Sequence, residues 1–244
     1  MKWQLVRALG VGIGVAGVMP ACGSSSGSGP NLDTSPPPTN VVTTEKFGET
    51  HTGDGTFYDF ADGTGACGFD KTSDVHIAAL NKDEWANSAW CGACADVTGP
   101  NGNSVRVRIV DECGDCPKGQ LDFHPDVFAV LAPKAQGRIA ITWSFVACDA
   151  VGPVKYKYKQ GSNPYWTAVQ VRNSRYPIAK FESSKDGVNW KELPRQNFAY
   201  FLDDKGFGAG TTQVRITAQD GTTLLDTLPE VQESLEVAGQ AQFQ

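Results

Sequence analysis

Two aspartates flank a close pair of cysteines in the segment IVDECGDCPKGQLDF, residues 109–123. Asp111 precedes Cys113 and Cys116, and Asp122 follows them. Two carboxylates placed on either side of a scissile bond can hydrolyse it, one as general acid and the other as general base. A single aspartate at a strand end or before a helix is more commonly a turn or cap residue. The spacing alone therefore leaves open whether these carboxylates cut a ligand or only hold it.

The seven cysteines divide into one near the N-terminus and six that all precede residue 150. The pairs CGAC and CGDC suit a structural zinc site, and one C-x-x-C pair alone can carry redox chemistry. The N-terminal residues described below predict export. Exported proteins meet oxidising compartments, which favour disulfides over metal binding or redox chemistry for these cysteines. We therefore expect three disulfides and no metal. The six cysteines are Cys67, Cys91, Cys94, Cys113, Cys116 and Cys148.

The first 21 residues predict export. Lys2 and Arg7 precede the apolar run ALGVGIGVAGVMPA, and the stretch contains no acidic residue. This pattern is typical of a signal peptide, and the run is shorter than the roughly 20 residues that span a bilayer. Cys22 follows VMPA, which resembles a bacterial lipobox with Met19 where leucine is preferred. We expect an extracellular protein, with simple secretion and a lipid anchor on Cys22 as open alternatives.

Composition and charge change along the chain in a way that predicts two domains within its 244 residues. A Ser/Gly/Pro-rich stretch precedes the first domain and predicts a disordered linker. Residues 48–150 hold 7 basic and 15 acidic residues, net −8, whereas residues 151–244 hold 11 and 10, net +1. The expected parts are a signal peptide at 1–21, a linker at 22–47, domains at 48–149 and 150–236, and a flexible tail at 237–244.

Both domains are predicted to be all-β, because apolar and polar residues alternate with period two. One short helix is expected at HPDVFAVLA, where Pro125 suits the first turn. Its buried side would comprise Val127, Phe128, Val130 and Leu131. We expect Trp143 and Trp190 to be core residues. The predicted strands include SVRVRIVD, GRIAITWSF, VKYKYK, TAVQVRN and QVRITAQD.

Four segments together resemble expansins, specifically the bacterial two-domain type, from about residue 48 to 235: GTFYDFADGTGACGF, AWCGACADVTGPNG, VRIVDECGDCPKGQLDFHPDVFAVL and YWTAVQVRNSRYPIAKFE. The resemblance implies a six-stranded double-psi β-barrel with a short helix, followed by an immunoglobulin-like β-sandwich that binds cellulose. The cysteine layout resembles that of plant expansins. It implies the disulfides Cys67–Cys91, Cys94–Cys148 and Cys113–Cys116.

The same resemblance assigns a polar groove on the barrel. It makes Thr56, Tyr58 and Asp111 groove residues and Asp122 the counterpart of the general acid of family 45 endoglucanases. Cys113 stands where bacterial relatives carry a groove tyrosine.

The position of the general base in those endoglucanases is Phe60 in this chain. Asp59 is adjacent, but an offset of one residue in a strand points the side chain to the opposite face. Thr56, Tyr58 and Phe60 should share the groove face. The resemblance therefore implies wall loosening without bond cleavage.

In the second domain, the segment SNPYWTAVQV brings two aromatic residues to the start of a strand. Tyr165 and Trp166 can share one surface only if the chain is irregular there, which Pro164 favours. The resemblance makes Tyr165, Trp166 and Phe198 an aromatic row that stacks on cellulose, with Lys159 as a flanking polar contact. Stacking suits pyranose rings, because they present apolar faces.

Other functional classes find little support. His51, His76 and His124 are scattered, which is typical of ordinary surface or core histidines. No phosphate loop or Ser/His/Asp order stands out, and the acidic balance argues against nucleic acid.

We therefore expect a monomeric, non-hydrolytic wall-loosening protein without a cofactor. Its partners would be cellulose and related cell-wall glucans, with peptidoglycan as a further candidate. Two alternatives stay open. One is an endoglucanase with Asp122 as general acid and Asp111, Asp59 or Asp62 as base, and the other is a carbohydrate-binding protein with an inert barrel.

Overall fold

The computed structural model describes residues 47–59 and 61–244, which all belong to one compact unit. The predicted signal peptide, Cys22 and Phe60 lie outside the described residues. The expected domain boundary near residue 150 stays a prediction. Among the described residues, no helix is long and apolar enough to cross a membrane.

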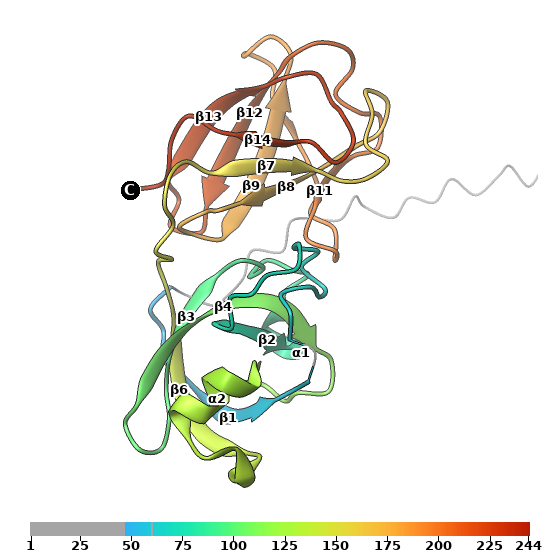
Figure 1. The fold of residues 1–244 in the computed structure, drawn as a ribbon. Coiled ribbons are helices and arrows are strands. Elements are labelled where there is room, and N and C mark those ends of the chain that lie inside the picture. The colour runs from blue at the N-terminus through green and yellow to red at the C-terminus, as the bar shows by residue number, and fades with distance from the viewer. Residues whose placement is uncertain (1–46, 60) are drawn as a thin grey trace, which may run out of the picture. The chain divides into compact units, whose positions relative to one another are not determined.

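Six strands form a closed barrel (Figure 1). Around the barrel they follow the order β1-β5-β2-β4-β3-β6, with β1 parallel to β5 and β2 parallel to β4. This confirms the expected six-stranded barrel. The strands are β1 (His51–Phe57), β2 (Ile77–Asn81), β3 (Cys94–Thr98), β4 (Ser104–Cys113), β5 (Leu121–Phe123) and β6 (Ile139–Val146).

The expected helix is α2 (Pro125–Leu131), and the His124 side chain caps it by accepting a hydrogen bond from the Asp126 amide. Val130 is 47% exposed, so its predicted place on the buried side was wrong. It falls between the buried positions of the helix, which are Val127, Phe128 and Leu131.

Two further helical turns lie in the barrel part of the chain, and neither was predicted. They are α1 (Lys82–Trp85) and a 3₁₀ turn (Lys134–Gln136). Each is too short for a 3.6-residue apolar period to show in the sequence.

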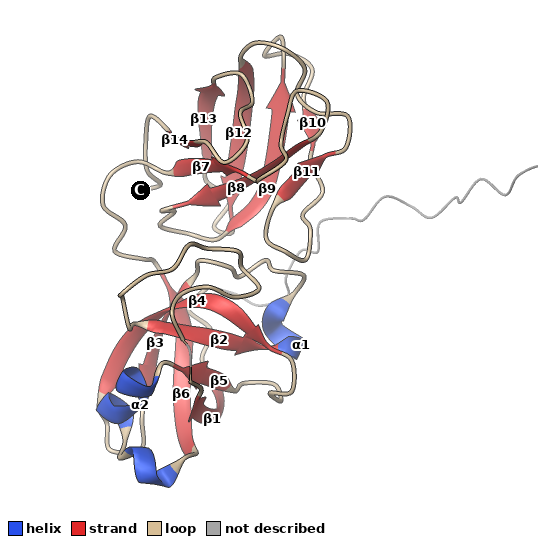
Figure 2. Ribbon diagram, turned by 45° about the vertical axis from the view of Figure 1, so that its right-hand side comes forward, coloured by secondary structure: helices blue, strands red, loops and turns tan. Residues whose placement is uncertain are grey.

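Eight strands form two four-stranded sheets, with the orders β11-β8-β7-β14 and β10-β9-β12-β13 (Figure 2). Tyr156 and Val169 from the first sheet share one apolar core with Phe181 and Val214 from the second, as expected for a β-sandwich. The strands are β7 (Lys155–Tyr158), β8 (Thr167–Arg172), β9 (Ile178–Ser184), β10 (Lys191–Glu192), β11 (Phe201–Asp203), β12 (Thr212–Ala218), β13 (Thr223–Leu228) and β14 (Glu236–Ala238).

Two details of the sandwich differ from the sequence-based expectation. Trp190 is half-buried rather than core, and the Arg215 guanidinium lies 4.4 Å from the centre of its ring. The segment expected to form a flexible tail instead packs on the sandwich. It contributes to β14, and Phe243 is only 2% exposed. Trp143, by contrast, is a core residue as predicted.

The three disulfides are those that the resemblance implied: Cys67–Cys91, Cys94–Cys148 and Cys113–Cys116. Their partners are 24, 54 and 3 residues apart in sequence. In the chain-entropy model they stabilise the fold by about 3.5, about 4 and about 2 kcal/mol, respectively. The Cys113–Cys116 ring therefore contributes least to the stability of the fold.

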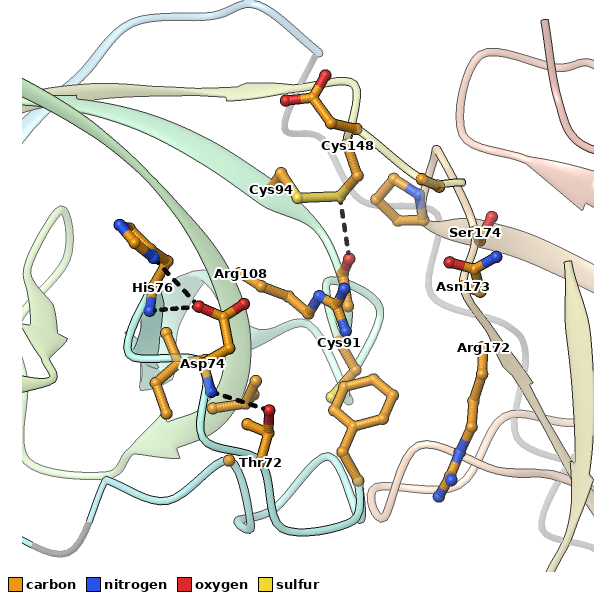
Figure 3. A pocket seen from close by; sticks show the side chains of 18 of the residues that line it. Thr72, Asp74, His76, Cys91, Cys94, Arg108, Cys148, Arg172, Asn173 and Ser174 are labelled. Atoms are coloured by element: carbon orange, nitrogen blue, oxygen red, sulfur yellow. Dashed lines mark hydrogen bonds and ion pairs between the residues drawn. A yellow bond between two sulfur atoms is a disulfide. The ribbon is translucent and has the colours of Figure 1, made fainter. Parts of the chain in front are cut away.

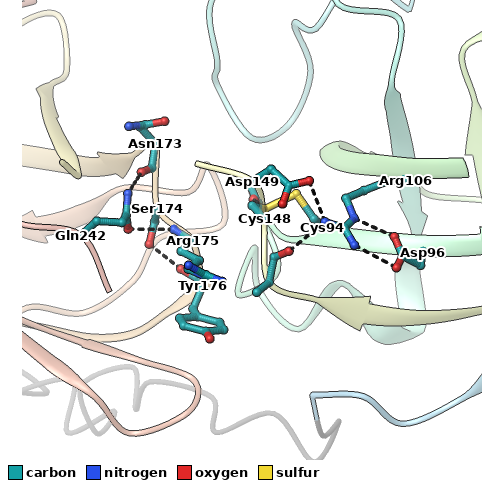
Figure 4. Close-up of a disulfide and its surroundings, with 12 residues drawn as sticks. Cys94, Asp96, Arg106, Cys148, Asp149, Asn173, Ser174, Arg175, Tyr176 and Gln242 are labelled. Carbon is teal, nitrogen blue, oxygen red and sulfur yellow. Dashed lines mark hydrogen bonds and ion pairs between the residues drawn. A yellow bond between two sulfur atoms is a disulfide. The ribbon is translucent and has the colours of Figure 1, made fainter. Parts of the chain in front are cut away.

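Close to the Cys94–Cys148 disulfide, Arg106 joins two carboxylates (Figure 4). Its guanidinium donates two hydrogen bonds to Asp96, at 2.7 and 3.0 Å, and one to Asp149 at 2.8 Å. Asp149 directly follows Cys148, so this ion-pair group and the disulfide both tie the end of the barrel segment to β3.

Candidate functional site

Strand register aligns the predicted groove residues in one line across four strands of the barrel. Thr56 on β1 pairs with Asp122 on β5, Asp122 with Ala79 on β2, and Ala79 with Asp111 on β4. Cross-strand neighbours project from the same face of a sheet. Leu121 and Phe123, on either side of Asp122, are fully buried in the core, so Asp122 points away from it. We call Thr56, Asp122, Ala79 and Asp111 the polar row.

The two aspartates of the polar row are separated by one strand that carries only the small side chain of Ala79. Neighbouring strands lie about 4.8 Å apart, which places the two backbones roughly 10 Å apart. The Asp111 carboxylate is fixed in place, because its Oδ1 accepts the backbone N–H groups of Ala66 at 2.7 Å and Glu112 at 2.8 Å. The row thus offers two half-buried carboxylates with only the small side chain of Ala79 between them.

A chain of hydrogen bonds leads to Asp122 from an arginine that sequence reasoning missed. Arg138 donates to Gln120 Oε1 at 3.0 Å, and Gln120 Nε2 donates to Thr56 Oγ1 at 2.9 Å. The Thr56 hydroxyl then donates to Asp122 Oδ1 at 2.5 Å. Arg138 is itself held by Asp54 at 2.8 Å. All three bonds donate toward Asp122, so they polarise one another and favour the carboxylate. We call Arg138, Gln120 and Thr56 the donor relay.

The backbone next to Gln120 is held by a close approach of two chain segments. Gly119 has φ +83°, and a Cβ there would lie 2.1 Å from the Thr52 carbonyl oxygen. The Trp143 indole N–H donates to the Gly119 carbonyl at 2.8 Å. Only glycine fits at this position, and the indole fixes the turn from which the Gln120 side chain projects.

A buried polar cluster supports the same turn from inside the barrel. Glu84 is 1% exposed and accepts hydrogen bonds from the Gly119 amide at 3.1 Å and from Asn81, while His51 Nδ1 lies 2.8 Å from its other oxygen. Asn81 also donates to the Gln120 carbonyl at 3.2 Å. Burial raises the pKa of the Glu84 carboxyl, but the bonds from His51 and Asn81 lower the pKa by more. This cluster therefore keeps a carboxylate under the donor relay.

The electrostatics of the polar row are dominated by burial. Burial raises the pKa of Asp122, and the charge of Asp111 adds to the rise, while the Thr56 hydrogen bond and Arg138 oppose it. The pKa of Asp122 is raised overall. Burial also raises the pKa of Tyr58, and the charges of Asp111, Asp122 and Asp62 raise it further. Tyr58 therefore stays a neutral phenol beside both aspartates.

Tyr58 extends the row just beyond the end of β1, where its amide donates to the Phe123 carbonyl at 3.1 Å. Its buried hydroxyl has no hydrogen-bond partner among the described residues. A buried hydroxyl without a partner is unfavourable, so a ligand whose binding exposed this hydroxyl could satisfy it. The structure thus brings together all four predicted groove residues.

We expect Gln120→Leu to raise the pKa of Asp122 further. The substitution keeps the size of the side chain but breaks the relay at its centre, so that Thr56 loses its donor and Arg138 its link to the row. Carbon-13 NMR titration of the Asp122 carboxyl measures the change. The control is Lys134→Met, which removes a cation that pairs with Asp126 instead. An unchanged Asp122 titration in Gln120→Leu would show that the relay has no electrostatic role.

The predicted aromatic residues of the sandwich lie on a tight turn rather than within a strand. Asn163 and Trp166 exchange two backbone hydrogen bonds, at 2.8 and 3.2 Å, and Asn163 Oδ1 accepts the Tyr165 amide at 2.9 Å. Tyr165 is 81% exposed and Trp166 is half-buried. The irregularity expected from Pro164 is therefore present, and both aromatic side chains leave the same turn.

The other two predicted contacts lie near each other. Lys159 Nζ is 5.8 Å from the centre of the Phe198 ring. In the β8–β11 register, Thr167 pairs with Asp203 and Val169 with Phe201. The turn precedes β8 at one end of this pair, and Phe198 precedes β11 at the other end. Tyr165 and Trp166 thus lie at one end of this strand pair and Phe198 at the other, with Lys159 Nζ near the Phe198 ring, which suits an extended ligand.

A separate cavity of about 760 Å³ has a different, highly charged lining (Figure 3). Asp74 accepts hydrogen bonds from the amide and ring of His76 there, and Arg108 and Arg172 also line it. No residue of the polar row, and none of the turn from Asn163 to Trp166 (the aromatic turn), lines this cavity. It is therefore distinct from both the polar row and the aromatic turn.

Comparisons with known proteins identify relatives of the chain. No protein-family model matches the chain. It is 32% identical over 180 residues to Expansin-YoaJ of Bacillus subtilis, covering 70% of this chain and 76% of that protein. It is also 32% identical over 187 residues to Expansin-like protein 5 of Dictyostelium discoideum, covering 72% and 78%.

Solved structures extend the likeness to three dimensions. The crystal structure of the apo expansin of Clavibacter michiganensis matches with a TM-score of 0.74 and 28% identity, covering 80% of this chain and 98% of that one. A mutant of that expansin in complex with cellohexaose matches with the same TM-score and coverage, at 27% identity.

Proposed function

Because the chain belongs to the expansin family, we propose that it is an exported protein that loosens cell-wall glucans without hydrolysing them. The aromatic turn of the sandwich would bind cellulose. The polar row would bind a glucan chain and disrupt its non-covalent contacts. The cellohexaose bound to a mutant of the related Clavibacter expansin supports a β-glucan as the ligand. No cofactor is needed for this activity.

The observation that carries the proposal is the polar row itself. One half-buried carboxylate, Asp122, is oriented by the donor relay, and Tyr58 offers a buried hydroxyl beside it. These groups can accept and donate hydrogen bonds to sugar hydroxyls, and Ala79 between the two aspartates carries only a small side chain. The row is thus equipped to hold a glucan.

Hydrolysis would also require a base that activates water, at about 6.5–9.5 Å from the acid in an inverting enzyme. Asp111 lies two strands away from Asp122 in the same row, but its Oδ1 is committed to two backbone amides. A hydrogen bond from Thr64 is the largest of several effects that lower the pKa of Asp62 to about 2, which makes it a weak base. Asp59 is exposed beyond the end of β1. The environments of these three aspartates therefore support glucan binding rather than glucan hydrolysis.

A wall-creep assay beside a reducing-sugar assay tests the proposal on the full chain. We expect extension of wall strips and no soluble sugar from amorphous cellulose or mixed-linkage glucan. Sugar release that is lost in Asp111→Asn or Asp59→Asn would instead establish an endoglucanase. Cellulose binding without creep would establish a carbohydrate-binding protein with an inert barrel. Pull-down on peptidoglycan decides whether that polymer is a second ligand.

A further inference from the structure

The smallest disulfide of the protein borders the polar row. Cys113 is the last residue of β4, and the Cys116 amide donates to the Cys113 carbonyl at 3.2 Å. The two sulfur atoms and a carboxylate oxygen of Asp122 all lie within 4.8 Å of one another. Because the sulfur atoms are bonded to each other, this cluster is a disulfide next to a carboxyl group rather than a metal site.

The two cysteines differ in exposure. Cys116 is 7% exposed, whereas Cys113 is half-buried and is followed by the exposed residues Gly114 and Asp115. A Cβ added at Gly114 would meet no atom within 4 Å, so nothing in the described structure covers this side of the loop. An external thiolate can therefore approach Cys113, and Cys116 is placed as the buried leaving group.

We propose that Cys113–Cys116 is a thiol–disulfide exchange site, in which Asp122 carries the proton of Cys116. The reaction partner is a thiol, either of a small molecule or of a cysteine in another protein. This activity goes beyond glucan binding and does not depend on it, because the exchange needs no sugar in the groove.

The exchange balances as two thiol attacks. A thiolate RS⁻ attacks Cys113 Sγ, the Cys113–Cys116 bond breaks, and the leaving Cys116 sulfur takes the proton of the Asp122 carboxyl. A second RS⁻ attacks the sulfur of the R group in the mixed disulfide and releases RSSR and the Cys113 thiolate. The two thiols are oxidised and the protein disulfide is reduced. In reverse, the Asp122 carboxylate takes the proton from Cys116, whose thiolate then attacks the mixed disulfide.

The environment of Asp122 suits this role. Burial raises its pKa, which moves its titration toward the range in which a proton carrier works near neutral pH. The charged and titratable groups around it are Asp111 on β4, Tyr58 after β1 and Arg138 before β6, with Asp115 exposed in the cysteine loop. Among the carboxylates of this set, Asp122 is the one with an oxygen within 4.8 Å of both sulfur atoms.

The fold also tolerates opening of this disulfide. It closes a ring of four residues, so its reduction releases little chain entropy compared with the disulfides that span 24 and 54 residues. Cys67 is fully buried and its partner Cys91 is half-buried, whereas Cys94 and Cys148 are 7% and 6% exposed. Because only Cys113–Cys116, among the described disulfides, combines a short ring with a carboxylate oxygen within 4.8 Å of both sulfur atoms, we expect exchange to be fastest there.

Timed reduction of the native full chain tests the proposal. The chain is treated with excess glutathione, quenched with an alkylating reagent and mapped by mass spectrometry. We expect Cys113–Cys116 to open at least 100-fold faster than the other two disulfides, without loss of the folded circular-dichroism signal. Equal resistance of all three disulfides, or opening only with global unfolding, overturns the proposal.

Two carboxylate variants test the role of Asp122. Asp122→Asn should slow the exchange at least tenfold and remove one inflection from its pH profile. Asp115→Asn is the matched control, since it removes a negative charge from the same loop without touching Asp122. It should not slow the exchange, because it lessens repulsion of the incoming thiolate. An Asp122→Asn variant with the native rate and pH profile refutes the proton transfer.

A pair of cysteine variants tests which sulfur is attacked. Each variant lacks the Cys113–Cys116 disulfide and keeps one thiol. Cys116→Ser keeps the half-buried Cys113 thiol, and Cys113→Ser keeps the buried Cys116 thiol. With oxidised glutathione, Cys116→Ser should form the mixed disulfide at least tenfold faster. The reverse order contradicts the assignment. Comparing glutathione with a cysteine-containing peptide of equal thiol pKa then shows whether a small-molecule thiol or a protein cysteine reduces the disulfide faster. If neither thiol reduces Cys113–Cys116, the proposal is overturned.

Discussion

Replacing both Tyr165 and Trp166 by alanine should weaken cellulose binding about tenfold or more. The two side chains leave one turn, and Tyr165 is 81% exposed, so it has no packing role that would require its ring. Aromatic contacts of this kind contribute on the order of 1 kcal/mol each beyond simple contact. Loss of two such contacts corresponds to at least about a tenfold change in the dissociation constant. Pull-down on cellulose with a titration of the polymer measures it.

Trp190→Ala provides the matched control, because Trp190 is a half-buried aromatic residue between β9 and β10 with Arg215 over its ring. We expect it to leave binding unchanged. Raising salt to physiological strength should also have little effect, since the segment after residue 150 is nearly neutral. Binding that survives the double substitution but falls with salt would place the cellulose surface elsewhere and make it electrostatic.

The sequence-based prediction worked where a residue's neighbours in sequence decide its structure. The alternation in SVRVRIVD predicted β4, which the structure extends to Cys113. The proline and apolar spacing after His124 predicted α2. The three disulfide pairs followed from the resemblance to expansins rather than from spacing, because six cysteines alone allow many pairings.

The rest of the site depends on contacts between distant segments, which one sequence does not show. Gln120 meets Thr56 because β1 and β5 pair in parallel, and Arg138 reaches Gln120 from a loop before β6. A glutamine or an arginine at such a position does not, by its type alone, indicate a functional role. The Gly119 turn had one usable hint, a glycine before a polar residue and a strand, but its close contact with Thr52 is a tertiary feature.

The misplacement of Trp190 has a similar cause. Tryptophan is mostly buried on average, which favoured the core. The structure shows Arg215 over the ring, and Arg215 also donates to Glu182 at 2.7 Å. An exposed sheet face can thus hold a large aromatic residue beneath a paired arginine. Composition cannot distinguish this arrangement from core packing.

Asp122→Asn should abolish wall loosening, with at least a tenfold loss of creep rate, while cellulose binding stays nearly unchanged. Asparagine keeps an oxygen that can accept the Thr56 hydroxyl, so the shape of the row is preserved. The variant loses the ionisable carboxyl and one acceptor oxygen, which a hydrogen bond between a charged group and a sugar hydroxyl would use. Binding depends on the aromatic turn of the sandwich, which this change does not touch. Creep of wall strips and cellulose pull-down are measured on the same preparation.

Asp126→Asn is the matched control, because Asp126 is an exposed barrel aspartate that pairs with Lys134 outside the polar row. It should leave both activities at the native level. Normal creep in Asp122→Asn would remove Asp122 from the mechanism. Loss of creep together with a lowered melting temperature would indicate a structural role instead. The double variant Cys113→Ser with Cys116→Ser separates the two tasks of Asp122: creep that persists without the disulfide shows that the carboxyl acts on glucan independently of thiol exchange.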